Sequence, residues 1–177
     1  MTTSSSGKPV GIGIIGCGRI STAYFNGASK FGIIKAVACA DINMQAATEK
    51  AAEHGCIAQT VPELLANDAV DIVINLTIPA VHADISLQAL RAGKHVYSEK
   101  PLTVQLSEAD EVLAFAEERG LRVGCAPDTC LGAGLQTCRK LIDYDWLGRI
   151  TSGTVHMLGS GPESWHPNPG FFYQLGG

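Results

Sequence analysis

Short apolar segments alternate along this chain with amphipathic ones, and this alternation limits the fold more than any other feature. The predicted strands span residues 10–15, 34–40, 70–76, 95–98 and 121–125, and the first of them is rich in β-branched residues. Segments with helical spacing fill the intervals, at 19–30, 44–54, 62–66, 81–92 and 107–119. Strands that are apolar on both faces and are joined by helices form a parallel sheet with helices on both sides. The sequence therefore predicts a doubly wound, Rossmann-type α/β domain over residues 9–130.

The pattern changes after residue 130. Residues 135–142 have the spacing of one more helix, residues 150–158 have the pattern of a strand, and the last part is rich in aromatic residues, proline and glycine. A single strand beside an aromatic loop cannot bury its own apolar surface. We therefore expect residues 131–177 to be the incomplete start of a second, α+β domain. The missing surface would come either from a longer chain or from a partner.

The composition excludes several classes of function. The net charge is −4 and no cluster of Lys and Arg occurs, which argues against nucleic-acid binding. No apolar stretch has the length of a membrane span, and the polar N-terminus lacks the pattern of a signal peptide. The six cysteines lack the paired spacing of a zinc site, and free thiols are typical of a reducing compartment. We therefore expect a cytoplasmic protein with no metal site and with neither a membrane nor a nucleic acid as partner.

A glycine-rich turn joins the first predicted strand to the first predicted helix. Gly16 permits a tight turn, and Gly18 lets a pyrophosphate approach the backbone without a Cβ in the way. The amides at the start of the helix, at Arg19 and Ile20, would stabilise the phosphate charge together with the helix dipole. Ser21 occupies the position where this motif commonly has a third glycine. The turn indicates a dinucleotide site, and a tight turn that binds no ligand is the alternative.

Asp41 ends the second predicted strand and is the candidate partner of the adenosine ribose. An acidic residue at this position accepts hydrogen bonds from the ribose hydroxyls, and its charge repels the 2′-phosphate of NADP. The next residues, Ile42 and Asn43, add no positive charge that would bind this phosphate. The sequence therefore favours NAD over NADP. The alternative is that Asp41 only starts a turn or caps the next helix.

Lys100 directly follows the predicted strand at residues 95–98 and precedes Pro101. Because the carboxyl ends of parallel strands meet at one edge of a sheet, we expect its amine at the same edge as the glycine turn. Oxidation of an alcohol moves a hydride to nicotinamide and a proton to a base, and Lys100 is the candidate for that base. Glu99 can bind a ribose, orient Lys100 or be solvated. A surface lysine with no role in chemistry is the alternative.

Three motifs resemble those of the glucose-fructose oxidoreductase / inositol dehydrogenase (Gfo/Idh/MocA) family. They are the turn at residues 16–21, Thr77-Ile78-Pro79 with His82, and the segment at residues 92–102 that carries Glu99-Lys100-Pro101. The resemblance covers residues 9–130 and continues more loosely over residues 165–177. It implies an NAD(P)-dependent oxidoreductase that acts on a sugar, polyol or related carbonyl compound. It also implies that Lys100 lies near the nicotinamide and the reacting carbon, either as the base or as an electrostatic partner of a histidine base.

The resemblance further implies a second domain that shapes the substrate site and forms homo-oligomers. In that family, Asp and His partners of the lysine come from a later motif that begins with a glycine run. Gly176-Gly177 resembles the start of this run. This chain would then lack part of the catalytic set.

Residues after the strand at 70–76 are expected to lie against the cofactor. Thr77, Ile78 and Pro79 would form a wall beside it, although Asn75 and Thr77 could instead satisfy backbone groups at the strand end. His82 is expected either to start its helix or to contact the cofactor.

Candidate substrate residues follow the last strand of the first domain or lie near the end of the chain. They are Asp128, Thr129 and His166, for which turn formation or packing is the alternative. The predicted function is hydride transfer between the nicotinamide of NAD and a sugar, polyol or related carbonyl or alcohol substrate. A non-catalytic dinucleotide-sensing module, or an inactive fragment of such an enzyme, is the alternative.

Overall fold

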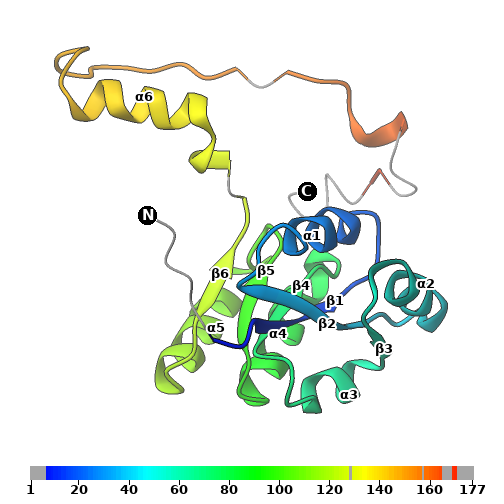
Figure 1. Ribbon diagram of the computed structural model, residues 1–177. Coiled ribbons are helices and arrows are strands. Elements are labelled where there is room, and N and C mark those ends of the chain that lie inside the picture. Colours follow the sequence, from blue (N-terminus) through cyan, green and yellow to red (C-terminus); the bar gives the residue numbers. More distant parts are fainter. Residues whose placement is uncertain (1–6, 128, 157, 165–168, 171–177) are drawn as a thin grey trace. The chain divides into compact units, whose positions relative to one another are not determined.

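Six parallel strands form a sheet in the described part of the first unit (Figure 1). The computed structural model describes residues 7–127, 129–156, 158–164 and 169–170, and the chain divides into the units Met1–Ala126 and Pro127–Gly177. The strands are β1 (Val10–Ile15), β2 (Ile34–Ala40), β3 (Ile57–Gln59), β4 (Ile72–Asn75), β5 (His95–Ser98) and β6 (Val123–Cys125). Their order in the sheet is β3-β2-β1-β4-β5-β6, which confirms the doubly wound fold that the sequence predicts.

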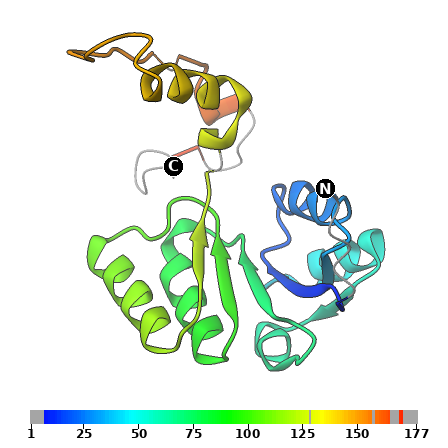
Figure 2. The same ribbon diagram turned by 60° about the vertical axis from the view of Figure 1, so that its left-hand side comes forward.

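Helices cover both faces of this sheet (Figures 1 and 2). They are α1 (Ser21–Ala28), α2 (Met44–His54), α3 (Val61–Ala66), α4 (His82–Arg91) and α5 (Leu106–Glu118), with a 3-10 turn, η1 (Pro79–Val81), before α4. Local signals fix the ends of α2, because Asn43 accepts a hydrogen bond from the Gln45 amide and Gly55 has a left-handed backbone with φ of 68°. The helix predicted over residues 44–54 is therefore confirmed at both ends.

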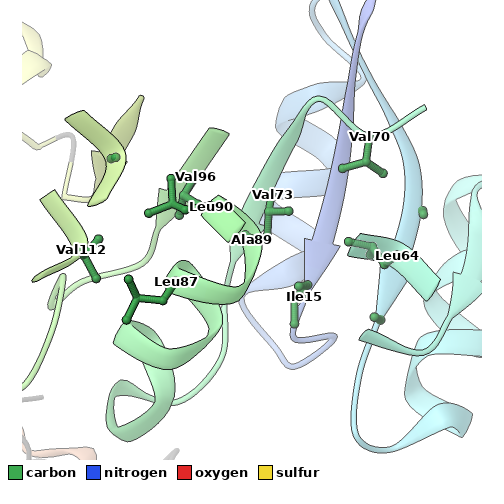
Figure 3. Packing of buried hydrophobic residues seen from close by; sticks show 12 residues of the cluster. Ile15, Leu64, Val70, Val73, Leu87, Ala89, Leu90, Val96 and Val112 are labelled. Atoms are coloured by element: carbon green, nitrogen blue, oxygen red, sulfur yellow. The ribbon is translucent and has the colours of Figure 1, made fainter. Parts of the chain in front are cut away.

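Alternate residues of each strand pack on opposite faces of the sheet. Ile15 and Val73 lie on one face, where they belong to a cluster with Leu64, Leu87 and Leu90 (Figure 3). The residues next to them along β1 and β4 belong to a second cluster with side chains from α1 and α2: Ile14, Ile74, Phe25 and Ala47. Because both faces bury apolar side chains, these strands are apolar along their whole length.

The strand order makes two neighbouring strands send their loops in opposite directions. β1 and β4 are neighbours, but the chain leaves β1 toward β2 and leaves β4 toward β5, on opposite sides of the sheet. The two loops stay in contact where they start, since the Leu76 amide donates to the Ile15 carbonyl at 2.8 Å. Ligands of doubly wound sheets bind outside the carboxyl ends of the strands at such a switch point. The fold therefore brings the glycine turn and residues 76–79 to the expected binding edge.

The secondary-structure prediction misses one short strand and places another where none forms, and several other element ends shift by one or two residues. β3 was not predicted, because it has three residues at the edge of the sheet and leaves Ile57 61% exposed. The strand predicted at residues 150–158 is wrong, since the described residues 150–156 and 158 form no strand. A strand exists only where a neighbouring strand shares its hydrogen bonds, and the second unit offers no strand among its described residues.

The described elements of the second unit are helical. They are η2 (Thr129–Leu131), α6 (Ala133–Asp143) and η3 (Pro162–Ser164), and α6 confirms the helix predicted at residues 135–142. None of the residues of α6 is buried. The expectation that residues 131–177 begin a larger second domain stays a prediction.

Candidate functional site

The glycine turn after β1 is held tightly by its neighbours. The Gly16 amide donates to the Ala40 carbonyl at 2.8 Å, which ties the turn to the end of β2. Gly16 has φ of +102°, and a Cβ on it would lie 2.5 Å from the Leu76 carbonyl oxygen. Only glycine fits this position, for reasons of both conformation and space. At Gly18, by contrast, a Cβ would meet no protein atom within 4 Å, so the backbone there faces open space.

The start of α1 has amides that no side chain satisfies among the described residues. Ile20 is the N-cap without a side-chain hydrogen bond, and the first turn contains no acidic residue. The amides of Arg19 and Ile20 likewise pair with no backbone acceptor in the described part of the chain. α3, by contrast, starts with a capping box in which Thr60 and Glu63 bond each other's amides. The start of α1 therefore has the free donors and the dipole that bind an anion.

Ser21, which stands in place of a third glycine, folds back onto the turn. Its hydroxyl and its amide both donate to the Gly18 carbonyl, at 2.7 and 3.1 Å, and the residue is fully buried. The small side chain therefore lets α1 pack against the sheet, and its hydrogen bonds close the turn.

Asp41 joins the end of β2 to the glycine turn. Its Oδ2 accepts from the Cys17 amide at 2.7 Å, and its Oδ1 accepts from the Asn43 amide at 2.8 Å. The carboxylate thus starts the turn before α2, and each oxygen keeps capacity for a further hydrogen bond. Ile42, which follows it, is fully exposed.

Cys17 of the glycine turn, Cys39 of β2 and Cys56 after α2 are free thiols. A hydrogen bond to Cys17 and burial raise the pKa of the Cys39 thiol to about 12. A hydrogen bond to Cys39 and burial also raise the pKa of Cys56, whereas the hydrogen bond from Cys39 lowers the pKa of Cys17. Cys39 and Cys56 therefore pack as neutral, protonated side chains. The described residues contain no group of three His, Cys, Asp or Glu side chains that could hold a metal ion.

The segment after β5 carries Glu99 and Lys100. The Glu99 amide donates to the Asn75 carbonyl at 2.8 Å, which continues the pairing of β5 with β4. The Glu99 carboxylate accepts from the Tyr24 hydroxyl at 2.8 Å and from the Lys100 amide at 3.0 Å. The Lys100 side chain is exposed, forms no ion pair with any described carboxylate, and precedes a cis peptide bond to Pro101.

Residues after β4 form a buried polar network. Asn75 is fully buried; its amide nitrogen donates to the His82 carbonyl at 3.0 Å and to the Ser86 hydroxyl at 3.2 Å. The Asn75 side-chain oxygen accepts from the Thr77 amide and hydroxyl, at 3.3 and 2.6 Å. Asn75 and Thr77 therefore satisfy groups at the strand end, and the cofactor contact expected of Thr77 stays a prediction. Ile78 beside them is 65% exposed and offers an apolar surface at this edge.

His82 begins its helix, which is one of the two roles expected of it, and the cofactor contact stays a prediction. The residue starts α4 and is 1% exposed. Its Nδ1 lies 2.6 Å from the Pro101 carbonyl oxygen and its Nε2 lies 2.9 Å from the Thr77 carbonyl oxygen. Both ring nitrogens face protein groups, so the side chain joins the Thr77 loop to the segment that contains Lys100.

The candidate substrate residues stay predictions. Thr129 lies in η2 of the second unit, and Asp128 and His166 lie outside the described residues.

Sequence reasoning missed Tyr24, because its partner Glu99 is 75 positions away and no local pattern marks the pair.

Comparison with known proteins agrees with this geometry. The Gfo/Idh/MocA family model, described as an oxidoreductase family with an NAD-binding Rossmann fold, matches residues 10–126. The chain belongs to this family. The match spans the first unit from β1 to the end of β6, and so includes the glycine turn and Lys100.

Members of the Gfo/Idh/MocA family with assigned activities are similar to this chain. The 1,5-anhydro-D-fructose reductase of Ensifer adhaerens is 32% identical over 145 residues, which are 81% of this chain and 44% of the reductase. A crystal structure of KijD10, a 3-ketoreductase from Actinomadura kijaniata in complex with NADP and TDP-benzene, has a TM-score of 0.74 and 29% identity over 77% of this chain and 43% of that one.

A second solved structure contains a different cofactor. The WlbA dehydrogenase from Bordetella pertussis, in complex with NADH and UDP-GlcNAcA, has a TM-score of 0.77 and 26% identity over 80% of this chain and 42% of that one. The chain therefore spans less than half the length of these three relatives. No helix in the described ranges is both long enough and apolar enough to cross a membrane.

Proposed function

We propose that this chain contains the cofactor-binding domain of an NAD-dependent oxidoreductase that acts on a sugar, polyol or related carbonyl or alcohol compound. The observation that carries the proposal is the uncapped start of α1 beside the open space at Gly18. A dinucleotide pyrophosphate needs such amides and such space. Membership of an oxidoreductase family supports the redox chemistry.

The first half of the site suits the pyrophosphate and the adenosine. We assign the pyrophosphate to Gly16, Gly18 and the amides of Arg19 and Ile20, because these groups combine a tight turn with unpaired donors. We assign the adenosine ribose to Asp41, whose carboxylate keeps acceptor capacity beyond its two hydrogen bonds.

The second half of the site suits the nicotinamide and the substrate. A bound nicotinamide would supply the acceptor or donor of the hydride. The exposed side chain of Ile78, with Thr77 and Pro79, supports a wall that excludes water from this part of the site. Glu99 has the acceptor capacity to bind the nearby ribose, and the exposed Lys100 amine suits contact with the substrate oxygen. Lys100 would hold or take the proton there, as the base or as an electrostatic partner.

The choice of NAD rests on the position of Asp41. Hydrogen bonds from Cys17 and Asn43 fix the carboxylate, so it cannot turn away from a 2′-phosphate without losing both. Its charge therefore disfavours NADP. The similar structures contain NADP in one case and NADH in another, so the preference depends on the residues of this chain.

We assign substrate recognition and the formation of homo-oligomers to the second unit. Relatives such as 1,5-anhydro-D-fructose reductase support a sugar-derived substrate. We propose that residues 131–177 begin a second domain that forms homo-oligomers in the cytoplasm, with Asp128, Thr129 and His166 as candidate substrate residues. The apolar side chains that α6 leaves exposed, Leu135 and Ile142, support a domain that buries them elsewhere.

Calorimetry tests the proposed cofactor and its chemistry. The wild-type chain should bind NADH about tenfold or more tightly than NADPH, and Asp41→Ala should narrow that ratio. Lys100→Ala should bind NADH within about threefold of wild type and of the matched control Lys30→Ala. No NADH binding by the wild-type chain would contradict the proposal. Binding without any change in NADH absorbance across a panel of sugars and polyols, in the longest available form of the protein, would favour a sensing module.

A further inference from the structure

A side-chain hydrogen bond joins α1 to the segment after β5. The Tyr24 hydroxyl donates to Oε1 of Glu99 at 2.8 Å. Tyr24 lies in the first turn of the helix whose start forms the proposed pyrophosphate site, and Glu99 directly precedes Lys100. One side chain therefore joins the phosphate-binding helix to the strand end that carries the lysine.

The Glu99 carboxylate is held at both oxygens. Oε2 accepts from the Lys100 amide at 3.0 Å, and the Glu99 backbone is fixed by its bond to the Asn75 carbonyl. Hydrogen bonds to an ionised carboxylate are stronger than those between neutral groups, so the Tyr24 hydroxyl limits the rotation of the carboxylate. Each oxygen keeps room for one more donor, as a ribose hydroxyl requires.

The ring of Tyr24 is positioned separately from its hydroxyl. It is half-buried and packs near the ring of Tyr97, with the centroids 6.4 Å apart and the planes at 57°. A phenylalanine at position 24 would keep this packing and lose only the hydroxyl. The contribution of the hydroxyl to Glu99 can therefore be measured without removing the ring.

The place of the pair in the sheet indicates which half of a dinucleotide it serves. In a doubly wound sheet the first strands bind the adenosine half, and the strands beyond the switch point bind the other half. Glu99 follows β5, beyond the switch point between β1 and β4. A carboxylate there meets the ribose that carries the nicotinamide.

We propose that Tyr24 is a positioning residue, which fixes the Glu99 carboxylate for the nicotinamide ribose and so couples the phosphate-binding helix to the Lys100 segment. This inference rests on the proposed function. It assigns a role to a side chain outside the groups proposed to bind the pyrophosphate and the substrate.

Binding of NADH and of ADP separates this role from a structural one. ADP lacks the nicotinamide ribose and so lacks the group that Glu99 would bind. Tyr24→Phe should weaken the NADH affinity about 3- to 10-fold, as expected for one lost hydrogen bond, and should change the ADP affinity less than about twofold. The matched control Tyr144→Phe, at an exposed tyrosine of the second unit, should change neither affinity. In a Glu99→Ala background, Tyr24→Phe should cause no further loss.

Three outcomes would overturn the inference. An unchanged NADH affinity in Tyr24→Phe would show that the hydroxyl has no role in binding. Equal losses for NADH and ADP would show a general structural effect, and an additive loss in the Glu99→Ala background would show that Tyr24 does not act through Glu99. If the wild-type chain itself binds no NADH, the proposed function fails first and this inference fails with it.

Discussion

Gly16→Ala and Gly18→Ala are expected to have different effects: the first should lower the stability of the protein, and the second should lower its affinity for NADH. In Gly16→Ala, the new Cβ would lie 2.5 Å from the Leu76 carbonyl oxygen, at a backbone with φ of +102°. A left-handed backbone costs a non-glycine residue about 1–2 kcal/mol, and overpacking against fixed atoms costs about 1–3 kcal/mol. The free energy of unfolding should therefore fall by about 2–5 kcal/mol, from a total that is typically about 5–15 kcal/mol.

Gly18→Ala is the matched variant. Its Cβ would meet no protein atom within 4 Å, and Gly18 is not among the glycines with positive φ. The stability should therefore change by less than about 1 kcal/mol. The methyl group would nevertheless occupy the space that we assign to the pyrophosphate, so NADH affinity should fall about tenfold or more.

Urea unfolding followed by circular dichroism measures the stability of both variants, and calorimetry measures their affinity for NADH. The melting temperature of Gly16→Ala should fall by about 4–20 °C, since 1 kcal/mol corresponds to about 2–4 °C in a chain of this size. A Gly16→Ala variant as stable as wild type would refute the steric reasoning. A Gly18→Ala variant that binds NADH as tightly as wild type would refute the assignment of the phosphate.

Three further predictions concern buried groups. Asn75→Leu should lower the free energy of unfolding by about 2–4 kcal/mol in urea denaturation, because four hydrogen bonds of a fully buried amide lose their partner; a loss below about 1 kcal/mol would contradict this. His82→Phe keeps a buried ring but removes both nitrogens that face the Thr77 and Pro101 carbonyls. Both the melting temperature and the NADH affinity should therefore fall. An unchanged NADH affinity would show that the link through His82 is unimportant for the site. At pH 8 iodoacetamide should alkylate the exposed Cys130 and Cys138 first, which mass spectrometry can show. The reason is that a pKa of about 12 leaves only about one part in 10,000 of the buried Cys39 as thiolate. Early alkylation of Cys39 in folded protein would contradict its burial.

The sequence predicts this fold well where local signals and burial agree. The strand β2 and the helix α2 match the predicted ranges at both ends, because continuous apolar residues mark the strand, while Asn43 and Gly55 mark the helix. The prediction from sequence fails where hydrogen bonding to a neighbouring strand decides whether a strand forms. β3 is too short and too exposed to have a pattern of its own, and the apolar residues at 150–156 form no strand without a described neighbour to pair with.

The same distinction applies to the site. Gly16 can be predicted because its motif is local, and the structure adds the close contact with Leu76 that makes glycine necessary there. His82 and Tyr24 depend on partners that are distant in sequence: Pro101 is 19 positions from His82, and Glu99 is 75 positions from Tyr24. No spacing rule predicts such contacts, so neither could be found from the sequence.

The central claim is that a dinucleotide binds with its pyrophosphate at the start of α1. Backbone amide NMR shifts of the labelled chain during titration with NADH test this most directly. We predict that the largest shifts occur at Gly18, Arg19 and Ile20, with smaller ones at Glu99 and Lys100. Largest shifts in another place, such as the groove between α5 and β6 lined by Leu113, Gly120 and Val123, or no shifts at all, would contradict the claim.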